Sequence, residues 1–152
     1  MITKNFTFKR LSKSNQKSLR ETLIKPNRSV HAQKKILIID DNEVDRYLIK
    51  KISQHTNMDV QFFEASSGEE GIACFSKISP DIVVLDTHLP QMDGFQVCRR
   101  IKNDTAVKAK VIMMTGQIDA VDTRKAREMG ADDHCVKTAD FMELMNSLKK
   151  II

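Results

Sequence analysis

The apolar positions of this chain follow two different spacings from residue 34 onward. Short runs of consecutive apolar residues, many of them β-branched, are typical of strands that are buried on both faces. Between these runs, apolar residues recur every three or four positions, which indicates helices with one buried face. The pattern predicts five strands alternating with five helices, and the predicted strands cover 35–39, 60–64, 82–85, 111–114 and 134–136.

The predicted helices are marked by apolar spacing and by residues that begin or end a helix. Val44, Leu48 and Ile52 recur every four residues and predict the buried face of the first helix. Asp119 is expected to cap the fourth helix, and Gly130 is a C-terminal signal for it. The remaining markers are a capping box of Ser67 and Glu70, a third helix with Phe95, Cys98 and Ile101, and a last helix with Phe141, Leu144, Met145, Leu148 and Ile152.

Strands that alternate with helices predict an α/β fold, a doubly wound parallel sheet covered by helices on both faces. The crossovers between its strands should be right-handed. Sheets of this kind bind ligands beyond the carboxyl ends of their strands. The residues that follow each predicted strand are therefore the candidates for a functional site.

Polar residues follow four of the five predicted strands. Asp40 and Asp41 come after the first strand, Asp86 after the third, Thr115 after the fourth and Lys137 after the fifth. A single Asp after a strand usually caps the next helix. Because the carboxyl ends of parallel strands meet at one edge of the sheet, these five side chains should come together there and form a functional site.

The chemistry of this set favours a divalent cation and a phosphoryl group. Two carboxylates ~4 Å apart repel each other by about 4 kcal/mol at an effective dielectric of ~20, and Lys137 offsets part of that repulsion. Mg²⁺ prefers a few carboxylates together with water and phosphate oxygens. Asp86 could then act as a nucleophile that forms an aspartyl phosphate, with Lys137 and the Thr115 hydroxyl contacting the transferred oxygens.

Composition narrows the class of protein. The chain has 152 residues, of which 41% are hydrophobic and 30% charged, as in one soluble globular domain. It contains neither an apolar run long enough for a membrane span nor the apolar core of a secretory signal. Cys74, Cys98 and Cys135 are too far apart for a disulfide framework or a zinc site and are expected in the core of a cytoplasmic protein.

The charge is concentrated at the N-terminus. Residues 1–33 hold eight of the 25 Lys and Arg residues but one of the 20 Asp and Glu residues. We expect a flexible basic arm at 1–33 and a near-neutral folded domain at 34–152. The arm could be a solvated tail, a segment that docks on a partner or on the domain, a contact for nucleic acid or membrane lipid, or a transit peptide.

Four segments of residues 34–152 together resemble the receiver domain of response regulators in two-component signalling. They are IIDDNE at 38–43, LDTHLPQMDG at 85–94, MMTG at 113–116 and GADDHCVK at 130–137. The resemblance implies a flavodoxin-like (βα)₅ fold with strand order 2-1-3-4-5. It further implies a phosphorylation-dependent switch that takes its phosphoryl group from a histidine kinase or a histidine phosphotransfer protein, and that is not an enzyme.

The same resemblance assigns roles to individual residues. Asp86 is implied as the phosphoacceptor, Asp40 and Asp41 as the Mg²⁺-binding pair, and Thr115 and Lys137 as the phosphoryl sensors. The implied metal ligands also include Asp86 itself and the backbone carbonyl of a further residue, His88.

Two positions depart from the usual receiver pattern. His134 stands where the family usually has Tyr or Phe, at the position expected to act as the switch. Thr138 stands where the family usually has Pro, and a trans bond is expected before it because a non-proline cis bond costs ~2.5–4 kcal/mol. The signalling surface is expected on the face of the fourth helix, the fifth strand and the fifth helix.

Two alternatives compete with a phosphorylated switch. A haloacid dehalogenase-type phosphatase needs Asp-x-Asp after its first strand, and this chain has Asp40, Asp41 and Asn42 there. A degenerate receiver would serve as a phosphorylation-independent docking module, although the acidic set is complete. The end of the chain after the last helix favours a stand-alone receiver that docks a partner or relays phosphate, and Asp132 and Asp133 are expected in a solvated loop.

Overall fold

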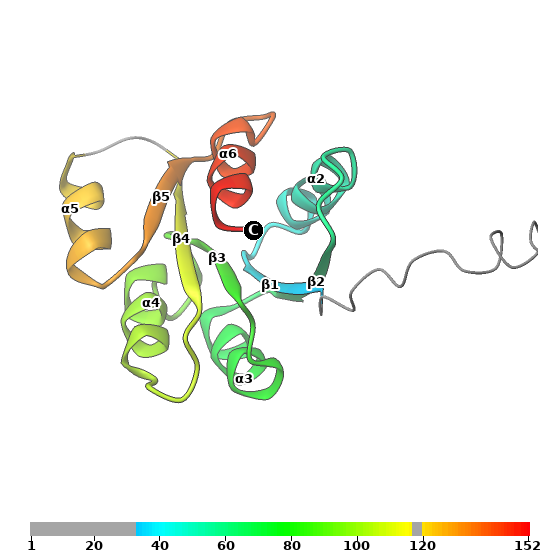
Figure 1. Ribbon diagram of the computed structural model, residues 1–152. Helices are drawn as coiled ribbons and strands as arrows, with labels where there is room; N and C mark the ends of the chain where they lie inside the picture. The colour runs from blue at the N-terminus through cyan, green and yellow to red at the C-terminus, as the bar shows by residue number, and fades with distance from the viewer. Residues whose placement is uncertain (1–32, 117–119) are drawn as a thin grey trace, which may run out of the picture. The chain divides into compact units, whose positions relative to one another are not determined.

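The computed structural model describes residues 33–116 and 120–152, so most of the basic arm and the expected cap Asp119 lie outside the described residues. Five parallel strands form one sheet in the order β2-β1-β3-β4-β5 (Figure 1). The predicted fold and strand order are confirmed. The strands are β1 (Lys34–Ile39), β2 (Val60–Ala65), β3 (Ile82–Asp86), β4 (Lys110–Thr115) and β5 (Asp133–Val136), and the helices are α2 (Glu43–Gln54), α3 (Gly68–Ile78), α4 (Gly94–Asn103), α5 (Ala120–Glu128) and α6 (Met142–Ile151).

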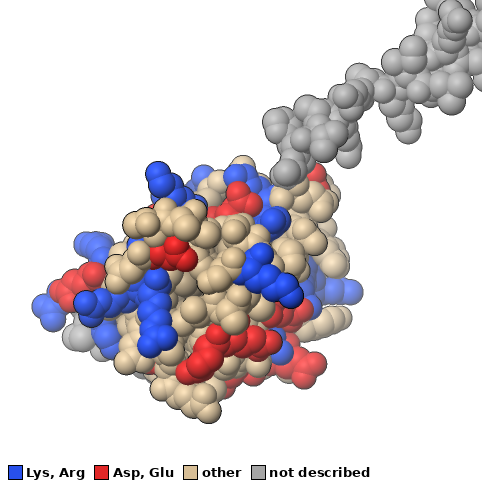
Figure 2. All heavy atoms as spheres, turned by 90° about the horizontal axis from the view of Figure 1, so that it is seen from below, with Lys and Arg blue, Asp and Glu red and all other residues tan. Residues whose placement is uncertain are grey.

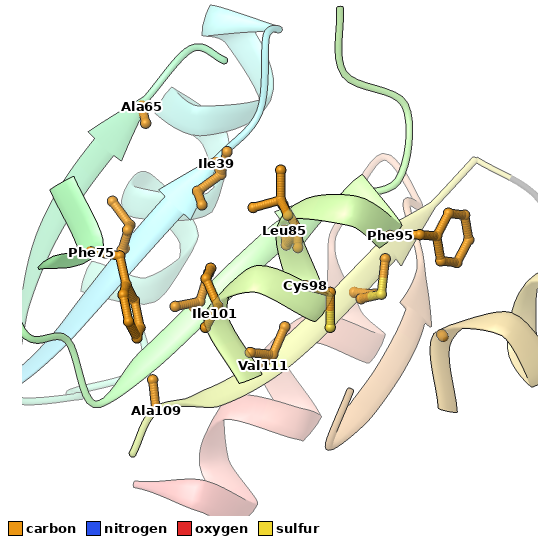
Figure 3. Close-up of a cluster of buried hydrophobic side chains, with 14 residues drawn as sticks. Ile39, Ala65, Phe75, Leu85, Phe95, Cys98, Ile101, Ala109 and Val111 are labelled. Atoms are coloured by element: carbon orange, nitrogen blue, oxygen red, sulfur yellow. The ribbon is translucent and has the colours of Figure 1, made fainter. Parts of the chain in front are cut away.

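Helices cover both faces of the sheet. On one face, Leu37 and Ile39 of β1 pack with residues of α3, α4 and α5, including Phe75 and Ile101 (Figure 3). On the other face, alternate residues of the same strands pack against α2 and α6. Successive side chains of a strand point to opposite faces, so strands buried on both sides need the continuous apolar runs seen in the sequence.

The first helix is rotated from the face that its spacing predicts. Ile49 is fully buried, and Leu48 and Ile52 pack partly against the same core, but Val44 is 62% exposed. Val44 lies in the first turn of α2, directly after the loop that leaves the carboxyl end of β1. The prediction for Val44 was wrong because the buried face of α2 runs through Ile49 and Ser53, and Val44 lies outside that face.

The capping box predicted at Ser67 and Glu70 is present with one change of partner, and two of the three cysteines predicted for the core are buried. The Ser67 hydroxyl accepts from the Glu70 backbone N–H at 3.2 Å, as in a capping box. The Glu70 carboxylate returns to the backbone N–H of Ser66 instead of that of Ser67. Cys98 and Cys135 are buried, and burial raises their pKa to about 11 and about 12, whereas Cys74 is half-buried. The two buried thiols are therefore protonated packing residues at neutral pH.

Asp132 lies in an exposed bend before β5, as the sequence predicts, but its carboxylate is also an ion-pair centre. Its carboxylate accepts from Lys102 Nζ at 2.7 Å, from Lys110 Nζ at 2.8 Å and from the Val111 backbone N–H at 2.9 Å. Asp133 is the first residue of β5 and accepts from the Ser147 hydroxyl at 2.6 Å. The loop expectation was therefore wrong for Asp133 only, and the ion pairs of Asp132 were not predicted because chain neighbours do not reveal which lysines the fold brings alongside.

We expect Asp132→Asn to destabilise the fold by about 1–2 kcal/mol at pH 7 because it removes charge-assisted hydrogen bonds. Burial alone would raise the pKa of Asp132, but Lys102, Lys110 and the Val111 N–H lower it below its ordinary value. A carboxyl with a lowered folded pKa stabilises above its unfolded pKa of about 3.9 and loses that contribution as pH falls further. The difference in the free energy of unfolding between the wild type and Asp132→Asn should therefore shrink below pH 4. Urea denaturation at a series of pH values measures it.

The exposed pair Arg124–Glu128 supplies a control for this prediction. Its side chains are 76% and 61% exposed, so Glu128→Gln should change stability by less than about 0.5 kcal/mol. Equal losses in Asp132→Asn and Glu128→Gln would contradict the assignment of Asp132 as a stabilising centre.

Charge is unevenly distributed over the folded domain. Figure 2 shows Lys and Arg side chains gathered on the side where α4 and α5 lie in Figure 1. The exposed basic residues of these two helices are Arg99, Arg100, Arg124, Lys125 and Arg127. Among the described residues, no helix combines the length and the apolarity that crossing a bilayer requires.

Candidate functional site

The carboxyl edge of the sheet gathers the polar residues that the sequence singled out. Asp40 and Asp41 follow β1, Asp86 ends β3, Thr115 ends β4, and Lys137 follows β5. Backbone hydrogen bonds tie these strand ends together: the Lys137 N–H donates to the Thr115 carbonyl at 2.8 Å, and the N–H after Asp86 donates to the Met114 carbonyl at 2.9 Å. The edge therefore has a fixed register in which the functional side chains are neighbours.

The Lys137 ammonium lies at the centre of this group. Its Nζ atom is 2.6 Å from Asp86 Oδ2, 2.7 Å from Asp40 Oδ2 and 3.0 Å from Asp45 Oδ2. Burial alone would lower the pKa of Lys137, but hydrogen bonds and charge from Asp40 and Asp86 raise it above its ordinary value. The lysine is therefore a permanent cation between the strand-end carboxylates.

Asp40, Asp41 and Asp86 form a three-carboxylate cluster. Each offers one oxygen, and the three oxygens all lie within 4.8 Å of one another. Asp40 is fully buried, and burial is the main cause that raises its pKa, with Lys137 acting in the opposite direction. Such a set of hard oxygen donors fits Mg²⁺, which takes carboxylate, carbonyl and water ligands.

Asp40 leaves one oxygen open toward the cluster. Its Oδ1 accepts from the Asn42 backbone N–H at 2.9 Å, which fixes the side chain. Its buried Oδ2 makes no hydrogen bond of good geometry, although Lys137 Nζ is at ion-pair distance. A buried acceptor that lacks a hydrogen bond is costly, so Oδ2 is suited to bind a cation.

The loop after β3 is built around Asp86. The Asp86 Oδ1 atom accepts from the His88 backbone N–H at 3.1 Å, so the His88 peptide is held beside the carboxylate. The His88 ring is exposed and its Nδ1 lies 3.0 Å from the Thr87 hydroxyl. This local order places the His88 backbone, and not its ring, next to the acidic cluster.

Gly94 allows this loop to close. Its N–H donates to the Thr87 carbonyl at 3.0 Å, and an added Cβ would lie 2.0 Å from the Asp86 carbonyl oxygen. Asp93 caps α4 through the Gln96 N–H at 2.8 Å. The Asp93-Gly94 pair is thus a helix start packed directly against the backbone of Asp86.

His134 lies on β5 at the side of the sheet that faces α5. Its Nε2 is 3.1 Å from the Thr123 hydroxyl of α5, and the residue is half-buried. Thr138 follows Lys137 through a trans bond, as the sequence predicts, since the described residues contain no cis peptide. His134 therefore connects the edge strand to a covering helix, and β4 lies between its strand and the strand of Asp86.

Two residues at the site were missed from the sequence. Asp45 contacts Lys137, and the Arg46 guanidinium donates to the Asp40 carbonyl oxygen at 2.6 Å. Both lie on the first turns of α2, and a helix that begins next to a site edge can extend side chains over it. Their proximity to Asp41 in the sequence was the available signal.

The family model for the response regulator receiver domain matches residues 36–149. This chain belongs to the receiver-domain family. The receiver is 34% identical over 125 residues to the "Probable transcriptional regulator ycf27" of Guillardia theta, covering 81% of this chain and 47% of that protein. The receiver therefore spans about half the length of the curated relatives it matches.

Solved structures share the receiver fold. The signal receiver domain of a DNA-binding response regulator from Colwellia psychrerythraea superposes with a TM-score of 0.71 at 26% identity, covering 78% of this chain and 97% of that one. The chemotaxis protein CheY4 of Vibrio cholerae has a TM-score of 0.72 at 22% identity, covering 80% of this chain and all of that one. Receiver domains are regulatory phosphoacceptor domains, and the acidic cluster of this receiver lies where its sheet places a ligand.

Proposed function

We propose that this receiver is a phosphorylation-dependent signalling switch whose phosphoacceptor is Asp86. The observation that carries the proposal is the contact of 2.6 Å between the Asp86 carboxylate and the Lys137 ammonium, inside a cluster that also holds Asp40 and Asp41. Asp86 is buried at a strand end. An Asp that only capped the next helix would not need a lysine as its partner. A carboxylate held between a cation and a metal-ligand set is arranged for phosphoryl transfer.

The reaction needs no general base. An ionised Asp86 oxygen attacks the phosphorus of a phosphohistidine, a P–O bond forms, and the P–N bond breaks with its electron pair left on the imidazole. Lys137 neutralises charge on the phosphoryl oxygens, and the Thr115 hydroxyl donates a hydrogen bond to one of them. Asp40, Asp41, Asp86 and the His88 carbonyl would hold Mg²⁺, which would supply further charge neutralisation when bound.

The partners follow from this chemistry. The phosphoryl donor is a histidine kinase or a histidine phosphotransfer protein in the cytoplasm. The downstream protein docks on the face of α5, β5 and α6, where His134 acts as the switch position. We assign residues 34–152 to the receiver and residues 1–33 to a basic arm that contributes to partner docking, with nucleic acid or membrane as the other candidate contacts.

Labelling with a small phosphodonor tests the proposal. Purified protein mixed with acetyl phosphate or phosphoramidate and Mg²⁺ should gain one phosphoryl group, visible by intact mass. The label should be stable in acid and lost in base, as an acyl phosphate is. Absence of labelling at saturating Mg²⁺ would overturn the proposal and favour a docking module that works without phosphorylation.

Measurements of Mg²⁺ affinity should distinguish the role of the acidic pair, Asp40 and Asp41, from that of the phosphoryl sensors. We expect Asp41→Ala to weaken Mg²⁺ binding about tenfold or more because it removes a carboxylate ligand. Thr115→Ala should leave the Mg²⁺ affinity within about twofold of the wild type, since its hydroxyl is not one of the proposed metal ligands. Calorimetric or fluorescence titration of the unphosphorylated proteins measures both, and equal affinities would contradict the assignment of Asp41.

His134 should affect signalling and not labelling. In His134→Ala the hydrogen bond to Thr123 is lost, so β5 and α5 are no longer linked by this side chain. We expect the rate of labelling to stay within about twofold, while the preference of a partner for the phosphorylated form falls, because a switch needs two states that bind differently. Loss of labelling in this variant would place His134 in the reaction site instead.

A further inference from the structure

A fourth carboxylate, Asp45, is held against the lysine of the site. Lys137 Nζ lies 3.0 Å from Asp45 Oδ2, in addition to its contacts with Asp40 and Asp86. An ammonium group has three N–H donors, and here three carboxylates surround it. Asp40 and Asp86 come from strand ends, whereas Asp45 comes from α2 and was not part of the set that the strand pattern predicted.

The place of Asp45 is fixed by the start of α2. The Asn42 side chain caps this helix and accepts from the backbone N–H groups of Val44 at 2.9 Å and Asp45 at 3.4 Å. Acidic residues in a first turn are stabilised by the helix dipole in whatever direction they point, and Glu43 in the same turn is exposed. The Asp45 side chain is instead 21% exposed and lies on Lys137. The dipole accounts for an acid in this turn but not for its contact with the lysine.

This contact bears on phosphorylation because a phosphoryl group on Asp86 needs an N–H donor from Lys137. Lys137 already donates to Asp86 and Asp45 and lies at ion-pair distance from Asp40, so the donor that Asp45 accepts is not available to the phosphoryl group. Asp40 is fully buried, and Asp86 itself carries the new group, so both stay beside the ammonium. Asp45 is the most exposed of the three partners, and water can replace its contact most easily.

We propose that Asp45 is a positioning residue that holds Lys137 on the α2 side of the site and competes with the phosphoryl group for its N–H donors. The inference rests on the proposed phosphorylation of Asp86. Asp45 touches no reacting atom and acts through Lys137. It thereby limits the share of the protein that is phosphorylated at a given supply of donor.

Three variants test this role in the full chain. Asp45→Asn keeps the shape of the side chain and removes its charge, Asp45→Glu keeps the charge, and Glu43→Gln removes an exposed charge from the same helical turn. Each is made alone and in a Lys137→Ala background. Phosphorylated and unphosphorylated protein are quantified by intact mass at steady state, with limiting acetyl phosphate and saturating Mg²⁺.

Asp45→Asn should raise the ratio of phosphorylated to unphosphorylated protein about threefold or more. The reason is that one negative charge that competes with the phosphoryl group for Lys137 is gone. Asp45→Glu should stay near the wild-type ratio, and Glu43→Gln should change it less than about 1.5-fold, since exposed charges are screened. In the Lys137→Ala background the effect of Asp45→Asn should disappear, as expected for residues that act through one another.

Three results would overturn the inference. They are a wild-type ratio in Asp45→Asn, equal effects of Asp45→Asn and Glu43→Gln, and an Asp45→Asn effect that persists without Lys137. A wild-type protein that takes no label under these conditions would instead refute the phosphorylation of Asp86, and the inference would fall with it. The failure of the inference and the failure of the proposed function therefore have different signatures.

Discussion

Asp86→Asn protein should carry no phosphoryl group after incubation with acetyl phosphate and Mg²⁺, under conditions that label the wild type. An amide has nearly the shape of a carboxylate, so the buried position stays filled, but it lacks the ionised oxygen that attacks phosphorus. Lys137→Ala should keep the nucleophile and lower the labelling rate about tenfold or more, because charge on the transferred oxygens is no longer neutralised. Intact mass and base-lability of the label measure both effects.

The control for this prediction is an aspartate outside the site. Asp104 follows α4, is half-buried, and accepts from the Ala106 backbone N–H at 2.9 Å. Asp104→Asn should be labelled at the wild-type rate, and circular dichroism should show all three variants folded. Wild-type labelling of folded Asp86→Asn would place the phosphoryl group elsewhere and remove the basis for the proposed function.

Gly94→Ala should destabilise the receiver by about 2–3 kcal/mol, at the upper end of the usual range for overpacking, because the backbone atoms that the methyl group would meet cannot move aside easily. The added methyl group would lie 2.0 Å from the Asp86 carbonyl oxygen and 2.8 Å from Thr87 Cα. Both are backbone atoms, so the clash is relieved only by moving the loop that carries the phosphoacceptor. Urea denaturation at pH 7 should show the loss as a lower midpoint, and the labelling rate of the folded variant should fall as well.

Gly116 supplies the matched substitution. It follows Thr115 at the same edge of the sheet, and no atom of the described residues lies within 4 Å of a Cβ built on it. Gly116→Ala should therefore change the free energy of unfolding by less than about 0.5 kcal/mol. Equal midpoints for the two variants would show that the loop after β3 adjusts freely, contrary to its packing in the structure.

The sequence by itself determined the order of the elements and the residues that follow each strand. Consecutive apolar residues such as Ile36–Ile39 require burial on both faces, which only a helix-covered parallel sheet provides. Once the strands are parallel, their carboxyl ends share an edge, so Asp40, Asp86 and Lys137 come together without any knowledge of side-chain contacts. The strand order and the roles of these residues came from motif resemblance, because periodicity does not distinguish one parallel order from another.

Tertiary structure decided every feature that depends on which side chains meet across elements. Asp45 reaches Lys137, 92 positions away in the chain, and Asp132 meets Lys102 and Lys110, because the sheet register and the helix rotation place them there. The close approach of Gly94 to Asp86 depends on how α4 seats against the loop after β3. Local patterns record which residues are apolar or charged along one segment, whereas pair contacts depend on distances between segments, and those distances are fixed only when the whole core packs.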